Sequence, residues 1–430
     1  MLRFGCSLQT KTPRRQLRPT RPERSAPARF FWADGAHRPP LRLPKPMSSI
    51  PNRIDQTQFL PNGQPQGCPP IHDKVVRALS EHALERLETA LSREEQFLRR
   101  PQTALGNTVS EVRISTRQMM IGLMGVETLR TFGLSHPPQF SLLRERLLID
   151  SSWIAGAADL GILAWFTAIC APERLGNLFN QFDFDATLEK QLNVNAIDTT
   201  GLALFLAGVS HARIAGDGKL PDLSDAALAA YTHLLANQGD SGAFGQIAFQ
   251  WRVPGLFRSR SGRFNDQMYT IYALTAFARA FGVEEPLAPA LACANAICAQ
   301  QGENGEWWFR YNKKSSLVVK RLPLCSLHQK GTAPLGLLAL SEICDQRFQS
   351  HVMRGVSMKE REAEWPQSAQ LERPHSDEAE PRRSVLRSIH DNCDAGACDV
   401  AKHGWTLYAL GSFAWPNEVR NSKSQSATAG

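Results

Sequence analysis

Six segments of this chain share one pattern, in which a few polar residues precede a helix-length stretch that is apolar nearly all round. They begin near Ser115, Asp159, Asp198, Asp266, Gln329 and Lys402. A helix that is apolar on every side has to be buried on every side. The chain must therefore enclose six buried helices within other structure, and few folds do so.

Helices of a second kind lie between these segments, with apolar residues on one face only. They cover 142–148, 226–237, 287–301 and 347–358, and a charged helix over 75–100 precedes the first buried segment. This alternation predicts an inner circle of helices wrapped by an outer circle. The predicted fold class is an all-α (α/α)6 toroid, a barrel of six helical hairpins. A HEAT-like solenoid is the structural alternative, but its helices are one-sided and its repeats are shorter.

The stretch from Arg263 to Ile343 shows most clearly how one hairpin leads to the next. A helix is expected to begin at Asn265-Asp266, because an Asn or Asp side chain accepts a free backbone N–H of the first turn. Gly282 follows its last apolar residue and is the matching stop. Strand signals are few, chiefly 308–311 and 317–320, and they predict one short β-hairpin around Asn312.

The two ends of the chain differ in composition from its middle. The net charge of +8 arises in residues 1–53, which hold 12 Lys/Arg and 2 Asp/Glu. The remainder is close to neutral, so composition gives no support for a basic nucleic-acid face. We expect a disordered basic, Pro-rich arm over 1–72, a toroid domain over 73–415 and a disordered tail over 416–430. The arm could also be a transit peptide or an over-extended start, with Met47 the preferred start.

Cysteine usage and hydropathy bear on the compartment. The nine cysteines are scattered, and Cys170, Cys293 and Cys344 fall on the apolar faces of predicted helices. That placement is typical of reduced core thiols rather than a disulfide framework. No apolar run approaches the roughly 18–20 residues that span a bilayer. We therefore expect a cytoplasmic protein without a membrane span.

Residues that open the inner helices are the candidates for function, because the first turns of these helices surround one end of such a barrel. Glycoside hydrolysis needs two carboxylates that face each other, and Asp198 with Asp266 is the predicted pair, with His328 assisting proton transfer. The predicted substrate-binding residues are Arg117, Asp159, Tyr269, Trp307, Trp308, Gln329, His403 and Trp405. Asp198 and Asp266 also stand where N-cap residues belong, a role that implies no catalysis.

Two further motifs resemble a known superfamily. Gln301-x-x-x-Gly305-x-Trp307 has the form of the QW repeat of terpenoid cyclases, and Gln238-x-x-x-Gly242-x-Phe244 is a degenerate copy. Asn265-Asp-Gln-Met-Tyr269, Ser326-Leu-His328-Gln329 and Thr332-Ala-Pro334 resemble an uncharacterised bacterial toroid family. That family is grouped with six-hairpin glycosidase-like and terpenoid cyclase/prenyltransferase toroids and is often met near polysaccharide genes. A Gln at a helix end and an aromatic residue beside it also serve as scaffold in any toroid.

The resemblance implies a carbohydrate-active toroid, either glycoside hydrolase-like or otherwise polysaccharide-processing, with an oligo- or polysaccharide as its substrate. The alternatives are a terpenoid cyclase/prenyltransferase-like enzyme, with an apolar aromatic chamber, or a non-catalytic binding toroid. Asp183-x-Asp185, in a predicted linker, lacks the acidic cluster of a cyclase. Cysteines such as Cys393 and Cys398 lack the CxxC spacing of structural zinc sites. No metal, cofactor or nucleic-acid partner is expected, and the oligomeric state stays open.

Overall fold

The computed structural model describes residues 80–91, 114–130, 139–194, 196–216, 220–247, 258–323, 328–344, 346, 348–357 and 395–414. The chain divides into two units, Met1–Ser48 and Ser49–Gly430, and all described residues belong to the second. The whole predicted arm (1–72), the predicted tail (416–430) and the cysteine Cys393 lie outside the described residues. The fold is therefore that of the second unit by itself.

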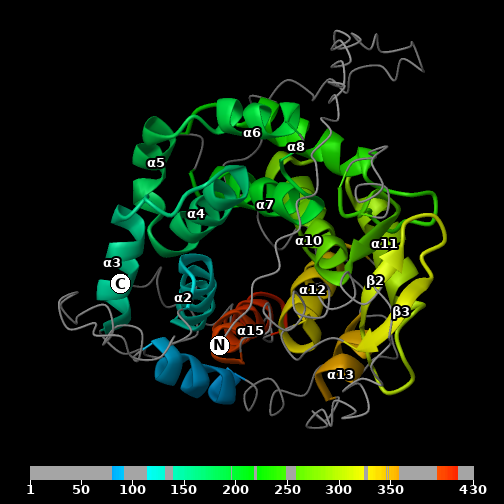
Figure 1. The fold of residues 1–430 in the computed structure, drawn as a ribbon. Helices are drawn as coiled ribbons and strands as arrows, with labels where there is room; N and C mark the ends of the chain where they lie inside the picture. Colours follow the sequence, from blue (N-terminus) through cyan, green and yellow to red (C-terminus); the bar gives the residue numbers. More distant parts are fainter. Residues whose placement is uncertain are drawn as a thin grey trace, which may run out of the picture. The chain divides into compact units, whose positions relative to one another are not determined.

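Six helices of the described part form an inner circle (Figure 1). Each packs against the next, and the last packs against the first, which closes the circle. They correspond one for one to the six apolar segments, so the predicted toroid is confirmed. Their bounds are α2 (Thr116–Arg130), α4 (Ala157–Cys170), α7 (Thr199–Ala215), α10 (Phe264–Phe281), α12 (Ala333–Ile343) and α15 (Ala395–Ala409).

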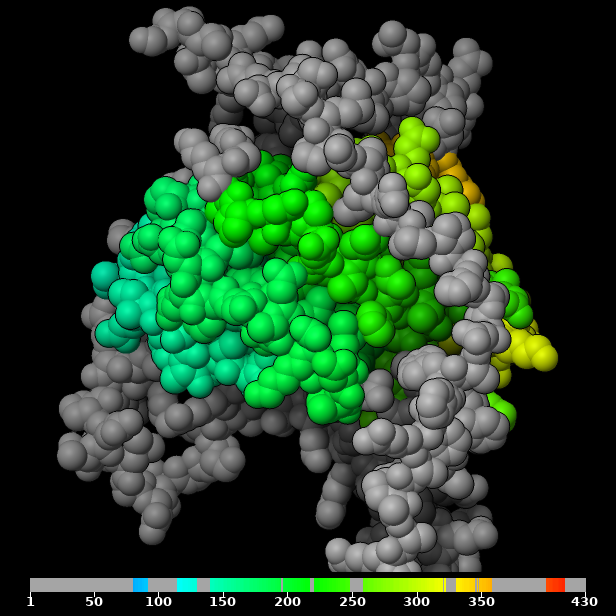
Figure 2. All heavy atoms as spheres, turned by 90° about the horizontal axis from the view of Figure 1, so that it is seen from above, coloured from blue at the N-terminus to red at the C-terminus, as the bar shows by residue number. Residues whose placement is uncertain are grey.

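Outer helices precede the first inner helix or lie between consecutive inner helices in the chain, and they surround the inner circle (Figure 1). They are a helix over 80–91, α3 (Gln139–Ile149), α5 (Leu175–Gln181), α6 (Phe184–Asn193), α8 (Ser224–Ala236), α11 (Leu287–Cys298) and α13 (Gln349–Ser357). Figure 2 shows the side formed by α5, α6 and α8, where the green side chains make one continuous surface. Phe182 and Asp183 lie between α5 and α6, as the predicted linker has them, but Asp185 belongs to α6, which the Asp183 carboxylate caps by accepting the Ala186 N–H at 2.9 Å.

Glycines set the closest approaches between inner helices. A Cβ at Gly208 of α7 would overlap the backbone of Gly161 on α4, and a Cβ at Gly161 would meet the Leu204 carbonyl oxygen at 2.5 Å. Gly125 of α2 and Gly404 of α15 stand in the same reciprocal relation. These inner helices thus touch backbone to backbone, which only glycine permits.

The Gln301 motif ties the end of one outer helix to the next outer helix. Gln301 Nε2 donates to the Gly305 carbonyl oxygen at 3.2 Å and to the His351 carbonyl oxygen of α13 at 2.9 Å. Gly305 has a φ of +95°, and a Cβ there would overlap the Arg354 carbonyl of α13. Trp307 ends the motif with no exposed surface.

The Gln238 motif repeats this geometry one hairpin earlier. Gln238 Nε2 donates to the carbonyl oxygens of Gly242 and of Pro289 in α11, both at 2.9 Å. Gly242 has a φ of +92°, and Phe244 is fully buried. Because two copies make the same bonds to the next outer helix, the motif acts as scaffold here.

A three-stranded antiparallel sheet stands beside α10, in the order β1 (Ser261–Arg263), β2 (Trp308–Asn312) and β3 (Val318–Pro323). The hairpin of β2 and β3 confirms the predicted one. β1 was not predicted, because three residues are too few to show an alternating pattern. β1 runs directly into α10, which begins at Phe264 and ends at Gly282 with a φ of +65°. The sheet thereby lies next to the residues that open α10.

Candidate functional site

Polar residues at the starts of the inner helices, called here the N-terminal rim, form two clusters. The first joins α2 and α4, where Arg117 Nε donates to Asp159 Oδ1 at 2.5 Å. Asp159 Oδ2 also accepts the Ala155 N–H at 2.9 Å. The Arg117 side chain is 47% exposed and that of Asp159 only 4%, so a ligand would meet the guanidinium rather than the carboxylate.

The second cluster joins α7 and α10 and brings the two predicted catalytic carboxylates together. Arg263, the residue before α10, places its Nη2 2.7 Å from Asp198 Oδ2 and 3.0 Å from Asp266 Oδ1. One guanidinium therefore bridges the carboxylates of two neighbouring inner helices. We call this Asp198–Arg263–Asp266 group the rim cluster.

Asp266 is enclosed by its partners. Its Oδ2 accepts the Arg263 backbone N–H at 2.7 Å, and its Oδ1 accepts the Thr200 hydroxyl at 2.7 Å. The residue has no exposed surface. Burial raises the pKa of Asp266, and the Arg263 guanidinium opposes that shift. Asp266 is the third residue of α10 rather than its cap, and in this arrangement it fixes Arg263 in place.

Asp198 keeps an open side. Its Oδ1 accepts the Gly201 N–H at 2.9 Å, as an N-cap does, and its other oxygen faces Arg263. The Asp198 side chain is 27% exposed and that of Arg263 is 30% exposed. Both interpretations of Asp198 thus fit the geometry, since it caps α7 and stands in a charged cluster. Arg263 was not among the predicted site residues, although it stands just before the Asn265-Asp266 start.

Tyr269 and Trp405 lie below the rim and contact each other. Trp405 Nε1 donates to the Tyr269 hydroxyl at 2.8 Å, and the two side-chain rings are 6.0 Å apart at 63°. Trp405 has no exposed surface, whereas Tyr269 is half-buried. Of this pair, both of which are predicted substrate-binding residues, only Tyr269 has an exposed part.

Aromatic side chains fill the barrel axis beneath them. Trp165 of α4 stacks on Tyr272 of α10 with centroids 4.8 Å apart, and it lies 4.9 Å from Trp405 of α15. Tyr272 and Tyr408 place their hydroxyl oxygens 3.2 Å apart, and Trp165 Nε1 donates to Tyr408. Since α4, α10 and α15 alternate around the circle, these contacts are made across the axis. We call this set the aromatic plug.

His211 of α7 completes the aromatic plug and gives it a pH dependence. Its Nε2 lies 2.7 Å from the Tyr272 hydroxyl, and its ring stacks on Trp165. Burial, aided by Arg279, lowers the pKa of His211 to about 3. The folded protein therefore holds this imidazole neutral where the unfolded chain, with a pKa near 6.5, would protonate it.

We expect stability to fall on acidification through this group. Between pH 6.5 and about 3 the unfolded chain binds a proton that folded His211 does not. The free energy of unfolding should drop by up to about 1.4 kcal/mol per pH unit from this histidine alone. Urea unfolding of wild type and His211→Gln from pH 7 to 4 measures the difference in slope. Equal slopes would contradict a neutral His211.

The other predicted residues stand apart from the rim cluster or outside the described side chains. The ring centroid of Trp307 lies 5.4 Å from that of Phe264, and Trp307 has no exposed surface. Its role in substrate binding stays a prediction. Trp308 is half-buried and donates to the Gln300 carbonyl oxygen at 2.7 Å. His403 is 4% exposed and lies 5.9 Å from His82. His328 and Gln329 belong to a π-helical turn before α12, and their side chains lie outside the described residues.

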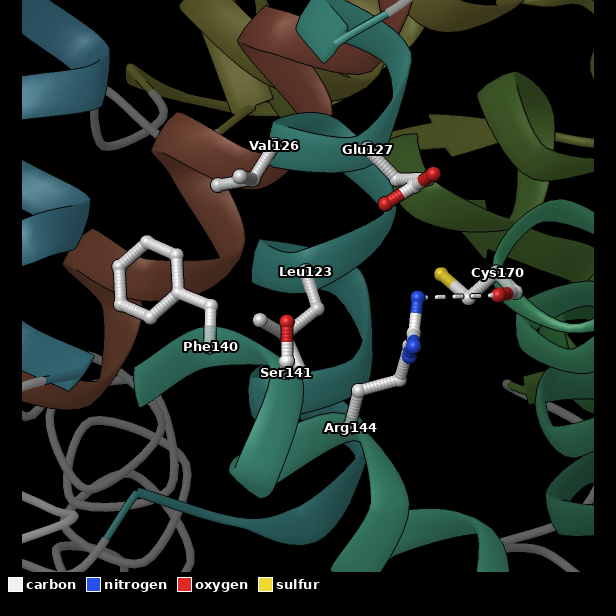
Figure 3. A pocket seen from close by; sticks show the side chains of 7 residues that line it. All are labelled: Leu123, Val126, Glu127, Phe140, Ser141, Arg144 and Cys170. Atoms are coloured by element: carbon white, nitrogen blue, oxygen red, sulfur yellow. Dashed lines mark hydrogen bonds between the residues drawn. The ribbon is translucent and has the colours of Figure 1, made fainter. Parts of the chain in front are cut away.

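A small pocket lies between α2, α3 and α4 (Figure 3). Arg144 reaches across it to the Cys170 carbonyl oxygen at 3.4 Å. Its volume of about 10 Å³ holds about one water molecule, so it does not fit a sugar. It is lined by Leu123, Val126, Glu127, Phe140, Ser141, Arg144 and Cys170.

In the part of the chain that the structure describes, no three His, Cys, Asp or Glu side chains gather closely enough to hold a metal ion. None of the helices in the described part is both long and apolar enough to cross a bilayer.

Comparisons with known proteins give structural likenesses only. No family model matches the sequence, and no curated protein does. A polysaccharide lyase matches with 11% identity and a TM-score of 0.44 over 80% of this chain and 98% of its own. A possible member of the GH105 family from Salmonella enterica serovar Paratyphi A matches with 11% identity and a TM-score of 0.46, over 84% and 97%.

A glycosyl hydrolase of family 88 from Bacteroides vulgatus matches with 12% identity and a TM-score of 0.43, over 79% of this chain and 99% of its own. The likeness is one of fold, so the reaction and the substrate of this protein depend on its own residues.

Proposed function

We propose that this protein binds an oligo- or polysaccharide at the N-terminal rim and processes it there. The rim cluster is the observation that supports this function. The side chains of Asp198 and Arg263 are both partly exposed. Asp266, which has no exposed surface, holds the Arg263 guanidinium in place beside Asp198. Polar ligands bind best where charged groups are fixed in position beforehand. A carboxylate acceptor beside a guanidinium donor suits the paired hydroxyls of a sugar.

The roles of the carboxylates differ in this proposal. Asp198 is the candidate acid or base, because it is the one of the predicted pair with an exposed side. Asp266 is a positioning residue, since its oxygens are taken by Arg263 and Thr200. Glycoside hydrolysis uses a second group near the substrate. His328, which the sequence places at the start of α12, remains the proposed partner for proton transfer.

The aromatic plug argues against the prenyl alternative. A terpenoid cyclase needs an empty apolar chamber, and the aromatic residues that would line it here contact one another instead. The Trp165 ring centroid lies 4.8 Å from that of Tyr272 and 4.9 Å from that of Trp405, across the axis. One observation favours another function, a non-catalytic toroid that binds the same saccharide. Asp266 is enclosed, so it cannot serve as the second catalytic carboxylate.

Replacing Asp198 tests the proposal and separates these two functions. Asp198→Asn keeps an oxygen for the Gly201 N–H but removes the charge. We expect turnover of a bound oligosaccharide to fall by about 100-fold or more, the usual contribution of a general acid or base. The measurement combines calorimetric binding to a panel of neutral and acidic oligosaccharides with chromatography of the products.

Asp183→Asn is the matched control, because Asp183 caps α6 with the same bond but lies on the outer circle. It should bind and turn over the saccharide like wild type. Binding that Asp198→Asn weakens, with no product from wild type, would assign the non-catalytic function. If no saccharide in the panel binds, or if both variants behave alike, the proposed function is contradicted.

A further inference from the structure

Gln267, in the first turn of α10, is a polar side chain with no exposed surface. Its Nε2 donates to the Phe244 carbonyl oxygen at 2.9 Å and to the Arg263 carbonyl oxygen at 3.2 Å. Its Oε1 accepts the Phe244 N–H at 2.7 Å and the Cys293 thiol at 3.4 Å. These contacts use both donor hydrogens and both acceptor lone pairs of the amide, so the side chain is held in one orientation.

The bonds to Phe244 are made to the N–H and to the carbonyl oxygen of one residue. Only an amide side chain offers a donor and an acceptor together at this spacing, because a carboxylate accepts and an ammonium group donates. The structure leaves room for this pairing at Gly262, where a Cβ would overlap the Phe244 carbonyl oxygen and the Gln267 amide nitrogen. Gln267 therefore binds the end of the Gln238 motif as a neighbouring strand would.

The bond to Arg263 carries this connection to the rim cluster. The Arg263 N–H donates to Asp266 at 2.7 Å, and the Arg263 carbonyl oxygen accepts from Gln267. Side chains of α10 thus fix the backbone on both sides of the Arg263 Cα. The loop that holds Phe244 also binds β1 directly, since the Gln246 N–H donates to the Ser261 carbonyl oxygen at 3.0 Å.

We propose that Gln267 is a positioning residue for the rim cluster. By tying the Arg263 backbone to that of Phe244, it holds the Arg263 guanidinium within hydrogen-bond distance of Asp198. The Gln238 motif then sets the geometry of the site as well as joining two outer helices. The effect of Gln267 on turnover rests on the proposed function, whereas its hold on Arg263 can be measured without a saccharide.

A double-mutant cycle measures that hold. Gln267→Met keeps about the size of the side chain and removes its hydrogen bonds, and Arg263→Leu removes the guanidinium. Urea unfolding is followed for wild type, both single variants and the double variant. In the Gln267→Met background, Arg263→Leu should lower the unfolding midpoint by less than about half of its effect in wild type, because a misplaced guanidinium has already lost its contacts.

Two further variants make the cycle specific. Gln301→Met is the matched control, since it removes an amide that donates to the Gly305 and His351 carbonyl oxygens and joins a turn to α13. Its effect should simply add to that of Arg263→Leu. Gln267→Glu serves if Gln267→Met does not fold. It keeps the acceptor for the Phe244 N–H and loses the amide donors, so the same reduced effect of Arg263→Leu is expected.

Turnover of an oligosaccharide gives a second readout, at a temperature where every variant is folded. A displacement of about 1 Å at a site can lower the rate by about 100-fold. Gln267→Met should therefore lower kcat by about 10- to 100-fold, and Gln301→Met should match wild type. A Gln267 that only supports the fold would lower the melting temperature and leave kcat unchanged. If wild type binds without turnover, the affinity takes the place of kcat.

The outcomes separate the two proposals. Additive effects of Gln267→Met and Arg263→Leu on the unfolding midpoint would overturn the positioning role and leave the proposed function standing. A non-additive cycle, in a protein that binds no saccharide, would support the hold of Gln267 on Arg263 and overturn the proposed function. Turnover or binding by Gln267→Met that equals wild type would overturn a role of Gln267 in the site.

Discussion

Gly208→Ala is expected to destabilise the protein by about 3 kcal/mol or more, at the upper end of what an added methyl group does in a packed core. The new Cβ would overlap the backbone of Gly161 on α4, and a helix backbone cannot turn aside as a side chain can. The same substitution inside an unpacked helix stabilises by up to about 1 kcal/mol. The packing of α7 on α4 therefore reverses the sign, and urea unfolding measures it.

Gly176→Ala on α5 is the matched control, because a Cβ at that position meets nothing within 4 Å. We expect a gain of about 0.5–1 kcal/mol there, from the lower backbone entropy of alanine in the unfolded chain. If Gly208→Ala also left stability unchanged or raised it, the backbone contact between α4 and α7 would be contradicted.

Asp266→Ala is expected to cost about 3–5 kcal/mol, as when one partner of a buried ion pair is removed. The change takes away the acceptor for the Arg263 backbone and side chain and for the Thr200 hydroxyl. It also leaves the guanidinium with Asp198 alone in the rim cluster. Denaturant unfolding gives the loss, and the saccharide assay should show weaker binding through the displaced Arg263.

Two comparisons make this result specific. Asp222→Ala removes a surface carboxylate that accepts the N–H and hydroxyl groups of Ser224, so its expected cost is about 1 kcal/mol or less. The double variant Arg263→Leu/Asp266→Leu removes both charges, and we expect it to be more stable than Asp266→Ala. A double variant no better than the single one would mean that the pair does not interact as described.

The fold could be predicted because its strongest signal is local. An inner helix such as α10 is apolar on all sides for several turns and ends at Gly282, whose φ of +65° suits glycine. The outer helices α5 and α6 were missed for the opposite reason. They are short, and in each only two residues are buried, which gives little periodicity to detect.

The candidate site could be predicted only in part. Asp198 and Asp266 both contact Arg263, because residues that open neighbouring inner helices must lie at one end of the barrel, and their catalytic role stays a prediction. Arg263, which links them, is 65 positions from Asp198 in the sequence. No local pattern shows which carboxylate such a long side chain will reach. The aromatic plug was hidden as well, since a helix that is apolar all round does not reveal which side faces the axis.

The aromatic plug limits how a polymer could use this protein. Because Trp165, Tyr272 and Tyr408 join across the axis, a chain bound at the N-terminal rim cannot thread through to the other end of the barrel. Under the proposed function, every sugar would leave by the side on which it entered. A polymer would then have to lie across the N-terminal rim rather than run along the barrel axis.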